Sequence, residues 1–311
     1  MPQFRIILNP TAGKGAAGKS LPILKKALDQ AGLDYDIVQT EHPWHAADLA
    51  QKAAVEGVET VVSAGGDGTF NEVLNGLMLA KKVQNRVPSL GVVSIGRGND
   101  FAFSMGIPTT LEASVLALSR EFKRRIDVGF VTSELYPEGR YFGNGIGVGF
   151  DAMVGFIAAE LPLQGTAGYL AGVLKTMMVY SPFPVMEITA DEEIFSQHTL
   201  MVSVMNGRRM GGAFMMAPGS KPDDNLFDLC IAGEMNKLKI ISMIPRFING
   251  TQASDHTIRS LRARRIKIRA LKGTLPAHAD GETLCTHGME ITAELLHQQI
   301  DLIYLPAEAK Q

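Results

Sequence analysis

Cysteine is scarce in this sequence: the 311 residues include only Cys230 and Cys285, and no C-x-x-C pair. Secreted domains that depend on disulfides contain paired cysteines in much larger numbers. We therefore expect two free thiols and a reducing, cytoplasmic compartment.

Long apolar runs are also absent, and the positive and negative charges nearly balance. The longest uncharged run within residues 161–186, LPLQGTAGYLAGVL, has 14 residues, whereas a membrane-spanning helix needs about 18 or more. The first residues, QFRIIL, are typical of a strand and not of a signal peptide. The 30 Lys and Arg against 32 Asp and Glu leave no overall field that would attract nucleic acid. The sequence predicts a soluble protein that does not bind nucleic acid.

Apolar and amphipathic segments alternate through the first third of the chain. Strands are expected near residues 4–8, 34–40, 59–64 and 90–95, and helices near 21–32, 45–57, 70–82 and 100–105. This β–α alternation predicts a three-layer α/β domain with a parallel sheet, which binds its ligand at the carboxyl ends of the strands.

The pattern changes near Asp127, beyond which extended segments dominate. Only residues 151–160 and 166–179 are typical of helices there. We expect a second domain, mostly an antiparallel β-sandwich. The predicted boundaries are 1–129 for the α/β domain and 130–311 for the β-rich domain, with the active site in the cleft between them.

The segment NPTAGKGAAGKS, residues 9–20, matches both G-x-G-x-x-G and G-x-x-x-x-G-K-S. A P-loop needs its first glycine close to the strand, but residues 9–12 intervene and Pro10 stiffens the chain. A dinucleotide site needs an acid after the second strand, where Glu41 is only loosely placed. A phosphate-proximal loop of another kind and a plain glycine-rich turn remain as alternatives.

The segment SAGGDGTFNE, residues 63–72, carries a stronger signal, because it joins an apolar strand to a helix. Gly65, Gly66 and Gly68 allow close approach of a ligand, and Thr69 is placed to cap the helix. Asp67 would be repelled by phosphates unless Mg²⁺ lies between them. The alternative is an ordinary Gly-Asp-Gly turn, but the combination favours a nucleotide site.

GGDGT followed by NE resembles the diacylglycerol kinase catalytic domain, a family that includes bacterial soluble lipid kinases, sphingosine kinases and ceramide kinases. NAD kinases and phosphofructokinases are more distant relatives. The resemblance runs nearly end to end. It also includes NPTAG at 9–13, Thr40, GRGNDFA at 96–102, IDVG at 126–129, NGRRMGGAFMMAPGSKPDD at 206–224 and ADGE at 279–282.

The resemblance implies an ATP-dependent kinase that uses Mg²⁺ and phosphorylates a lipid hydroxyl, such as that of diacylglycerol. It implies that Asp67, Asp127 and Asp280 form one acidic cluster and that Glu282 or Asp280 is the general base. The implied nucleotide contacts are Asn9, Pro10, Thr11, Ala12, Gly13, Thr40, Gly65, Gly66, Asp67, Gly68, Thr69, Asn71, Glu72 and Arg97.

A second Mg²⁺ site is implied at Asp224 with the main-chain oxygens of Lys221 and Leu226; the alternative is a solvated acidic turn. Two positions depart from the family pattern. Arg97 replaces a threonine that contacts nucleotide, and could instead meet a phosphate. Asn225 replaces a glycine, and because Asn tolerates left-handed backbone, we expect the turn to survive.

Two segments suggest peripheral attachment to a membrane. Residues 259–272 contain seven basic residues and no acid, which suits anionic lipid headgroups or simply a solvated strand. Residues 165–183 either border a cleft for a lipid tail or pack in the core. A homodimer is compatible with the sequence. Two other functions stay open: an NAD kinase-like enzyme acting on a non-lipid alcohol, and a catalytically inactive lipid-binding regulator.

Overall fold

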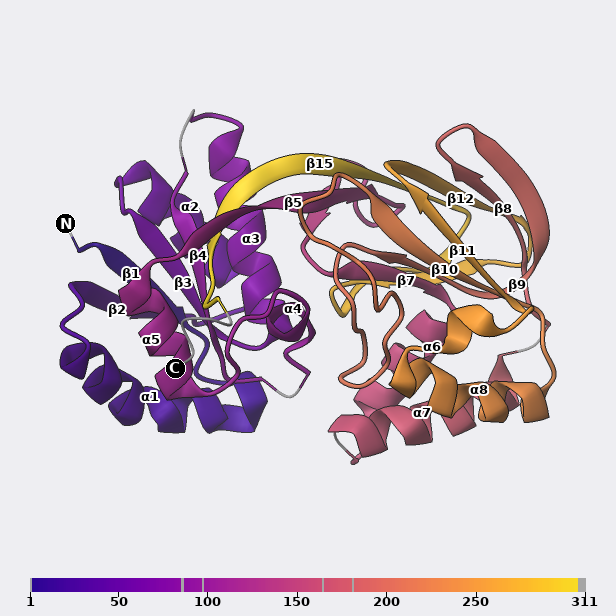
Figure 1. Cartoon of the computed structure of the whole chain (residues 1–311), viewed down its shortest axis with the longest axis horizontal. Helices are drawn as coiled ribbons and strands as arrows, with labels where there is room; N and C mark the ends of the chain where they lie inside the picture. The colour runs from indigo at the N-terminus through magenta and orange to yellow at the C-terminus, as the bar shows by residue number, and fades with distance from the viewer. Residues whose placement is uncertain (1, 85–86, 97, 164, 181, 307–311) are drawn as a thin grey trace. The chain divides into compact units, whose positions relative to one another are not determined.

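The computed structural model describes residues 2–306 apart from residues 85–86, 97, 164 and 181. Two compact units make up the chain: unit 1 is Met1–Ile126 with Gln298–Gln311, and unit 2 is Asp127–His297. The expected second domain, 130–311, is therefore too long at its C-terminal end. Strand β5 (Lys123–Thr132) enters unit 2, and strand β15 (Glu290–Ile303) returns to unit 1 (Figure 1).

Unit 1 is built on parallel strands in the order β4-β3-β1-β2, with the end of β15 pairing to β4. Helices α1 and α5 cover one face and α2 and α3 the other (Figure 1). The elements in chain order are β1 Phe4–Leu8, α1 Ala12–Gln30, β2 Tyr35–Gln39, α2 His45–Val55, β3 Thr60–Gly65, α3 Asp67–Lys81, β4 Ser89–Ser94, α4 Asp100–Ser104 and α5 Leu111–Arg120.

The central strands of unit 1 are buried on both faces, as their sequences predict. Every residue of β3 (TVVSAG) and β4 (SLGVVS) is buried, and β-branched residues suit such a position. Glycine at position 91 allows α5 to pack closely on the sheet, since a Cβ there would lie 2.7 Å from Leu118 Cδ2 and 3.0 Å from Val62 Cγ2. The expected three-layer α/β domain is confirmed.

Unit 2 is an antiparallel β-sandwich. One sheet follows the order β14-β13-β7-β9-β10-β11, and the other contains β8, β12 and β15 with β5 and β6. Strand β9 belongs to both sheets, because its first half pairs with β8 and its second half with β7 and β10. The strands are β6 Arg140–Phe142, β7 Gly145–Gly149, β8 Val185–Ala190, β9 Glu193–Met205, β10 Phe227–Gly233, β11 Ile258–Ala263, β12 Arg265–Lys272, β13 Leu275–Ala279 and β14 Glu282–Gly288.

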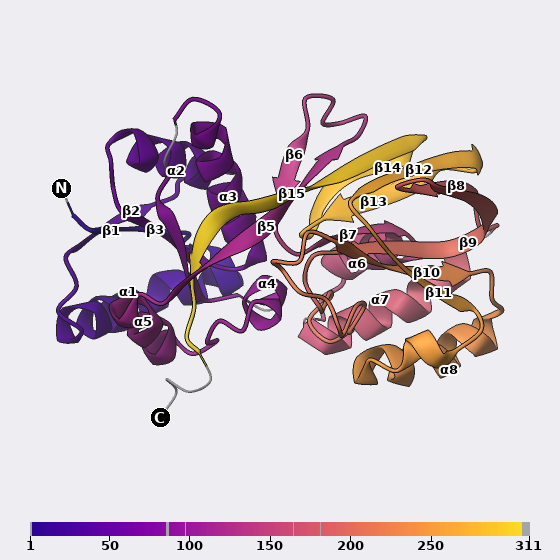
Figure 2. The same ribbon diagram turned by 45° about the horizontal axis from the view of Figure 1, so that its top comes forward.

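Three helices of unit 2 pack on one side of the sandwich: α6 (Phe150–Glu160), α7 (Gly165–Val179) and α8 (Lys237–Asn249), followed by a short 3₁₀ turn at Gln252–Ser254. Figure 2 shows all three on the same side of the strands. A second apolar cluster, separate from the core between the sheets, lies beneath them. The expected β-sandwich is confirmed. The three helices supply much of the lining of the apolar pocket described below.

Both cysteines are buried free thiols. Burial raises the pKa of Cys230 to about 12, with a contribution from the nearby charge of Asp151, and burial raises the pKa of Cys285 to about 11. Among the described residues, no helix is both long and apolar enough to span a bilayer.

Candidate functional site

Four loops of unit 1 gather at the carboxyl edge of its sheet, because parallel strands all end there. The backbone ladder continues into them: Asn9 N donates to Ala64 O at 3.0 Å, Thr40 N to Leu8 O at 2.9 Å, and Ile95 N to Gly65 O at 2.7 Å. The predicted positions Asn9, Thr40 and Gly65 are thus brought to one edge.

The first loop and the GGDGT loop are joined by side chains. Asn9 Nδ2 donates to Thr69 Oγ1 at 3.1 Å, and the hydroxyl of Thr11 donates to Asn9 Oδ1 at 2.8 Å. A Cβ at position 65 would lie 2.4 Å from Thr69 Oγ1, so glycine is needed there. The expectation that Thr69 caps α3 is wrong: Gly66 occupies the N-cap, and Thr69 instead orients Asn9.

The first loop turns sharply before α1 becomes regular. Gly13, Lys14 and Gly15 all have positive φ, at 60°, 59° and 86°. Two of the three are glycines, which adopt this conformation without strain. Pro10 O accepts from Gly18 N at 3.1 Å, and Ala12 N donates to Asn9 O at 3.1 Å. The loop is therefore fixed by its own backbone.

Asp67 lies in the first turn of α3, next to Gly68, and faces the loop that follows β4. Its Oδ1 accepts from Phe101 N at 3.1 Å, and a Cβ at Gly98 would lie 3.0 Å from its Oδ2. Gly66 and Gly96 also touch, since a Cβ at position 96 would lie 2.6 Å from Gly66 Cα. Gly66 and Asp67 thus lie against Gly96, Gly98 and Phe101 of the segment that follows β4. Arg97 lies outside the described residues.

Asn71 and Glu72, two of the predicted nucleotide contacts, form hydrogen bonds within and between helices of unit 1. Asn71 is fully buried, and its Oδ1 accepts from Asn75 Nδ2 at 3.1 Å within α3. Glu72 Oε2 accepts from Ala46 N at 3.2 Å, in the first turn of α2. These contacts give the NE of the motif a role in helix packing, and the nucleotide contacts expected of both residues stay predictions.

In unit 2, Asp280 is held by backbone amides. Its Oδ2 accepts from Gly143 N at 2.7 Å, and its Oδ1 from Asn144 N at 2.9 Å and Gly145 N at 3.0 Å. Asp280 itself has φ of 50°, at the turn between β13 and β14. Both carboxylate oxygens therefore fix the backbone that precedes β7.

Glu282 is more open. Its side chain is 45% exposed, and its Oε2 lies 3.8 Å from Nη2 of Arg140. Arg140 is almost fully buried, and its Nη1 donates to the hydroxyl of Tyr136 at 2.9 Å. Arg140 is not predicted from the sequence, because it is an isolated cation in a short strand and no motif or spacing marks it.

Asp127 is completely buried and connects three segments of unit 2. Its Oδ2 accepts from Asn225 N at 2.7 Å, and its Oδ1 lies 2.8 Å from His297 Nδ1. Asn206 Nδ2 donates to the main-chain oxygens of Asp127 and Gly143, at 3.0 and 2.8 Å. Asp127 and Asp280 thus belong to one polar network, which Asn206 joins. Asn225 has φ of 65°, so the turn survives as expected.

The second predicted metal site does not fit Mg²⁺ in this arrangement. Asp224 forms an ion pair with Arg262, which also lies 3.3 Å from Asp228, and Leu226 N donates to Asp224 Oδ1 at 3.2 Å. A guanidinium therefore already supplies the positive charge that a cation would bring. Among the described residues, no group of three or more His, Cys, Asp or Glu side chains could hold a metal ion.

The basic segment 259–272 is largely neutralised. Five of its side chains pair with carboxylates: Arg259 with Glu193, Arg262 with Asp224, Arg265 with Glu294, Lys267 with Glu290 and Arg269 with Glu187. These pairs favour the solvated strand face over a site for anionic headgroups.

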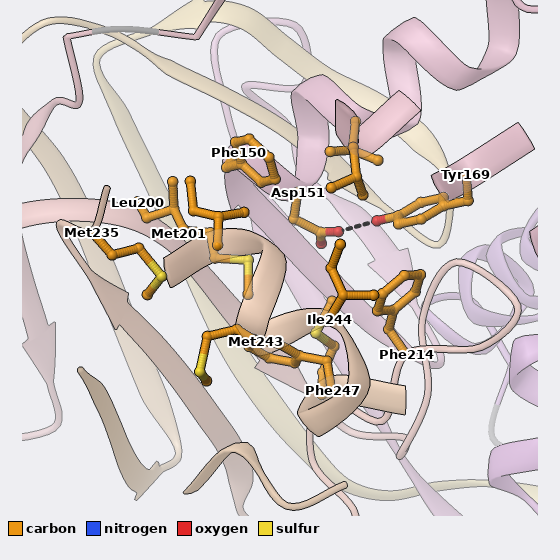
Figure 3. Close-up of a pocket in the computed structure, with 14 residues that line it drawn as sticks. Phe150, Asp151, Tyr169, Leu200, Met201, Phe214, Met235, Met243, Ile244 and Phe247 are labelled. Atoms are coloured by element: carbon orange, nitrogen blue, oxygen red, sulfur yellow. Dashed lines mark hydrogen bonds between the residues drawn. The ribbon is translucent and has the colours of Figure 1, made fainter. Parts of the chain in front are cut away.

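An apolar pocket lies between the helices of unit 2 and strand β9. Its walls include Phe150, Val154, Val173, Met201, Phe214 and Met243. Figure 3 shows these side chains around a single carboxylate, that of Asp151. Tyr169 and Val173 of α7 line this pocket, and Val173 and Met177 also pack in the apolar cluster beneath the helices. The two alternatives for residues 165–183 thus both have support, and a lipid tail in the pocket stays a prediction.

Comparisons with known proteins agree with this architecture. Residues 3–131 match the model described as Diacylglycerol kinase catalytic domain, and residues 144–303 match the YegS C-terminal NAD kinase beta sandwich-like domain. The diacylglycerol kinase of Bacillus subtilis (strain 168) is 33% identical over 91% of this chain and 90% of its own length. That of Staphylococcus saprophyticus is 28% identical over 89% and 88%.

Solved structures show the same fold. A diacylglycerol kinase structure from Bacillus anthracis str. Sterne superposes with a TM-score of 0.72 at 22% identity, covering 98% of both chains. An NAD kinase from Archaeoglobus fulgidus in complex with ATP gives a TM-score of 0.52 at 14% identity, covering 96% of this chain and 93% of that one.

Proposed function

Because the chain belongs to the diacylglycerol kinase catalytic-domain family, we propose that it transfers the γ-phosphoryl group of ATP to a hydroxyl of a lipid such as diacylglycerol. The observation that carries the proposal is the apolar pocket of unit 2: its Asp151 lies 3.6 Å from His278 of β13, the strand that leads into the turn with Asp280 and Glu282. A kinase of small polar alcohols has no use for such a pocket.

Unit 1 would hold the nucleotide. Its glycine-rich loops expose backbone at the carboxyl edge of the sheet, and α3 begins there, so its first amides suit phosphate oxygens. The NAD kinase relative bound to ATP has the same fold. We propose contacts from the backbone of residues 65–69, from Asn9, Thr11 and Gly13 with Pro10 and Ala12 shaping their loop, and from Thr40.

Asp67 is the residue that fits Mg²⁺. Mg²⁺ is usually held by one or two carboxylates together with substrate phosphates, so a single carboxylate among glycines is sufficient. When bound, the ion would neutralise the charge of the phosphates. Asp67 also keeps the loop after β4 in place through Phe101 N.

Unit 2 would hold the acceptor and remove its proton. We propose Glu282 as the general base, because it is partly exposed, whereas the oxygens of Asp280 are engaged by three amides. The guanidinium of Arg140 limits where the Glu282 carboxylate can lie. Asp280 and Asp127 would be positioning residues, which hold the turn and the loop before β7.

The lipid would be taken from a membrane surface through α7 and α8. Leu174, Met178, Leu238 and Ile241 are exposed on these helices by 50%, 73%, 80% and 46%. Neither helix contains an acidic residue, whereas both contain lysine. Apolar side chains beside lysines suit the interface of an anionic bilayer, and these helices also line the pocket.

The two alternatives make different demands. An NAD kinase-like enzyme would need polar groups to recognise the second nucleoside, and the pocket of unit 2 is lined almost entirely by carbon and sulfur. An inactive lipid-binding regulator would need the pocket but neither the Asn9–Thr69 contact nor the Asp280 turn. A lipid kinase needs all three features: the glycine-rich loops of unit 1, the Asp280 turn and the apolar pocket of unit 2.

The test is transfer of ³²P from [γ-³²P]ATP, with Mg²⁺ in mixed micelles, to diacylglycerol, phosphatidylglycerol, ceramide, sphingosine and NAD. We expect a radiolabelled lipid product that depends on both ATP and Mg²⁺. Labelled NADP without labelled lipid would favour the NAD kinase-like alternative. Lipid binding without any product, at enzyme concentrations near those of the substrate, would favour the inactive regulator.

A further inference from the structure

The turn between β13 and β14 consists of Asp280 and Gly281, and Ala279 pairs with Glu282 across it. Both turn residues have positive φ, at 50° and 87°, as in a type I′ hairpin turn. Glycine adopts this conformation freely, whereas an aspartate does so at a cost. Because Glu282 follows the turn directly, the geometry of the turn decides where its side chain projects.

The two halves of this turn are held from different sides. On the Asp280 side, the backbone N–H donates to Gly145 O at 3.0 Å, and the carboxylate accepts from the three amides described above. On the Gly281 side, the amide donates to His278 Nδ1 at 3.3 Å. A Cβ built on Gly281 would meet no heavy atom of the described residues within 4 Å, its chain neighbours apart. Packing therefore adds little to the contact that His278 makes.

His278 is in turn firmly placed. It is 7% exposed in β13, where it pairs with Gly147 of β7 and with Thr283 of β14. A Cβ at Gly147 would lie 2.6 Å from His278 Nε2, so the glycine leaves room for the ring. A side chain confined between two neighbouring strands can hold the turn that follows it.

A buried carboxylate favours one tautomer of the His278 ring. Because Nδ1 accepts from Gly281 N, a neutral ring carries its proton on Nε2. Nε2 lies 3.6 Å from Asp151 Oδ2, which is longer than a hydrogen bond but close enough for electrostatic attraction. The hydroxyl of Tyr169 donates to Asp151 Oδ1 and holds the carboxylate there (Figure 3). Asp151 thus favours the tautomer whose Nδ1 lone pair faces Gly281.

We propose that His278 is a positioning residue for the kinase reaction: its Nδ1 lone pair fixes the Gly281 half of the turn and thereby the carboxylate of Glu282. The inference rests on the proposed role of Glu282 as general base. His278 is not among the residues predicted from the sequence, although it directly precedes ADGE at 279–282. It acts through the backbone of the turn and does not itself take the proton of the lipid hydroxyl.

The test uses two substitutions that each keep one part of the imidazole's chemistry. In His278→Asn, the amide oxygen can occupy the place of Nδ1 and accept from Gly281 N. In His278→Gln, the amide group extends to the place of Nε2, and no acceptor remains for Gly281 N. We expect His278→Gln to lower kcat about 10–100-fold, because small displacements of a catalytic group are costly, and His278→Asn to keep most of the wild-type kcat. The KM for ATP should be unchanged in both.

The pair separates positioning from a merely structural role, because both variants lose the ring and its packing. If that packing were what matters, kcat would be the same in the two variants, whether low or normal, and this result would overturn the inference. Melting temperatures of both variants show whether each is folded under the assay conditions.

A second measurement does not depend on catalysis. In protein labelled with ¹⁵N-glycine, the Gly281 amide should exchange its hydrogen about fivefold more slowly in wild type and His278→Asn than in His278→Gln, the effect of one hydrogen bond. Exchange in wild type at the rate of an unstructured glycine would overturn the inference without any variant that might misfold. Equal exchange in all three proteins would overturn it as well.

The two measurements also separate this inference from the proposed function. If Glu282→Gln loses turnover but His278→Gln does not, the kinase function stands and the inference fails. If no lipid is phosphorylated, yet exchange at Gly281 distinguishes His278→Asn from His278→Gln as expected, the kinase function fails and the role of His278 in the turn stands.

Discussion

Asp280 and Glu282 are two positions apart, yet their surroundings differ completely. Asp280 accepts three backbone hydrogen bonds, whereas Glu282 is partly open and lies near one buried guanidinium. The acceptor-only chemistry of a carboxylate explains why Asp280 suits its place: an amide group there would point a donor at other donors. The chain thus uses one acid to shape the turn and leaves the other available for chemistry.

We expect Glu282→Gln to lower kcat by about 10²–10⁴-fold, because a carboxamide cannot accept the proton of the lipid hydroxyl. The melting temperature and the KM for ATP should stay at wild-type values, since the side chain is 45% exposed. Steady-state kinetics and thermal unfolding check this. Turnover within a factor of two of wild type would rule out Glu282 as the base.

Asp280→Asn should behave differently. Placing a donor opposite the amides of Gly143, Asn144 and Gly145 costs about 1–3 kcal/mol in the free energy of unfolding. Turnover should fall together with stability, because the turn that carries Glu282 is displaced. Denaturant titration beside Glu282→Gln is the matched comparison. Lost activity with unchanged stability would instead mark Asp280 as the base.

At the scale of elements, helix α8 is tied to the loop that follows it. Lys239 pairs with Asp255, which also accepts from Thr257 N at 3.1 Å and Thr257 Oγ1 at 2.8 Å. The hydrogen bond from Lys239, followed by those from Thr257, holds the pKa of Asp255 well below its ordinary value. The segment that lines the pocket therefore depends on one ionised carboxylate.

This pKa gives a pH dependence of defined sign. Because the pKa is lower in the folded state, the stabilisation is complete above the unfolded pKa, near pH 4, and is lost as the pH falls towards the folded value. The difference in melting temperature between wild type and Asp255→Asn should be constant from pH 7 to 5 and narrower at pH 3. Glu192→Gln, at an exposed position, is the control. If the melting temperatures of wild type and Asp255→Asn differ as much at pH 3 as at pH 7, the charge of Asp255 is not the source of the stabilisation.

Helices α7 and α8 also carry the proposed membrane surface. Met178→Glu with Leu238→Glu should weaken binding to vesicles containing anionic lipid by about tenfold or more, because exposed apolar area is lost and negative charge is added. Sedimentation with vesicles measures this. Ile194→Glu is the control, since this residue is 66% exposed but lies on β9. Equal weakening by the control, or none by the double variant, would contradict the assignment.

At the scale of the molecule, unit 1 consists of two segments of the sequence, and its C-terminal segment follows unit 2 along the chain. Leu302, Ile303 and Leu305 are buried in unit 1, where Leu302 pairs with Leu90 of β4. Arg125 Nε donates to Asp301 Oδ1 at 2.9 Å, and this bond lowers the pKa of Asp301. The last strand is therefore part of unit 1, the half of the protein that we propose to bind the nucleotide.

A chain that ends at His297 should keep the sandwich and lose the α/β unit. Each large buried apolar side chain that is removed costs about 1.5–3 kcal/mol, and Leu302, Ile303 and Leu305 all lie beyond this point. Limited proteolysis with mass spectrometry should show rapid cleavage within residues 2–126 and protection within 127–297. Equal protection of both segments would mean that unit 1 is complete without its C-terminal strand.

The sequence by itself determined the class of each half and most of the candidate nucleotide loops. Alternating apolar periods fix a parallel α/β unit, because strands buried on both faces must be continuously apolar. Glycines on both sides of an aspartate indicate that a ligand or another segment can come close to the backbone there. Local patterns of this kind need no knowledge of distant contacts, and Gly65 and Asp67 lie at the end of β3 and the start of α3, as they predict.

Only the tertiary structure decided which polar groups are available for chemistry. The sequence cannot show that Asn71 faces Asn75, that Arg262 neutralises Asp224, or that three amides converge on Asp280, because these contacts depend on the packing of several segments. For the same reason Arg140 and Asp151 carry no signal in the sequence. Burial and long-range hydrogen bonds assign their roles, and both arise only when the chain has folded.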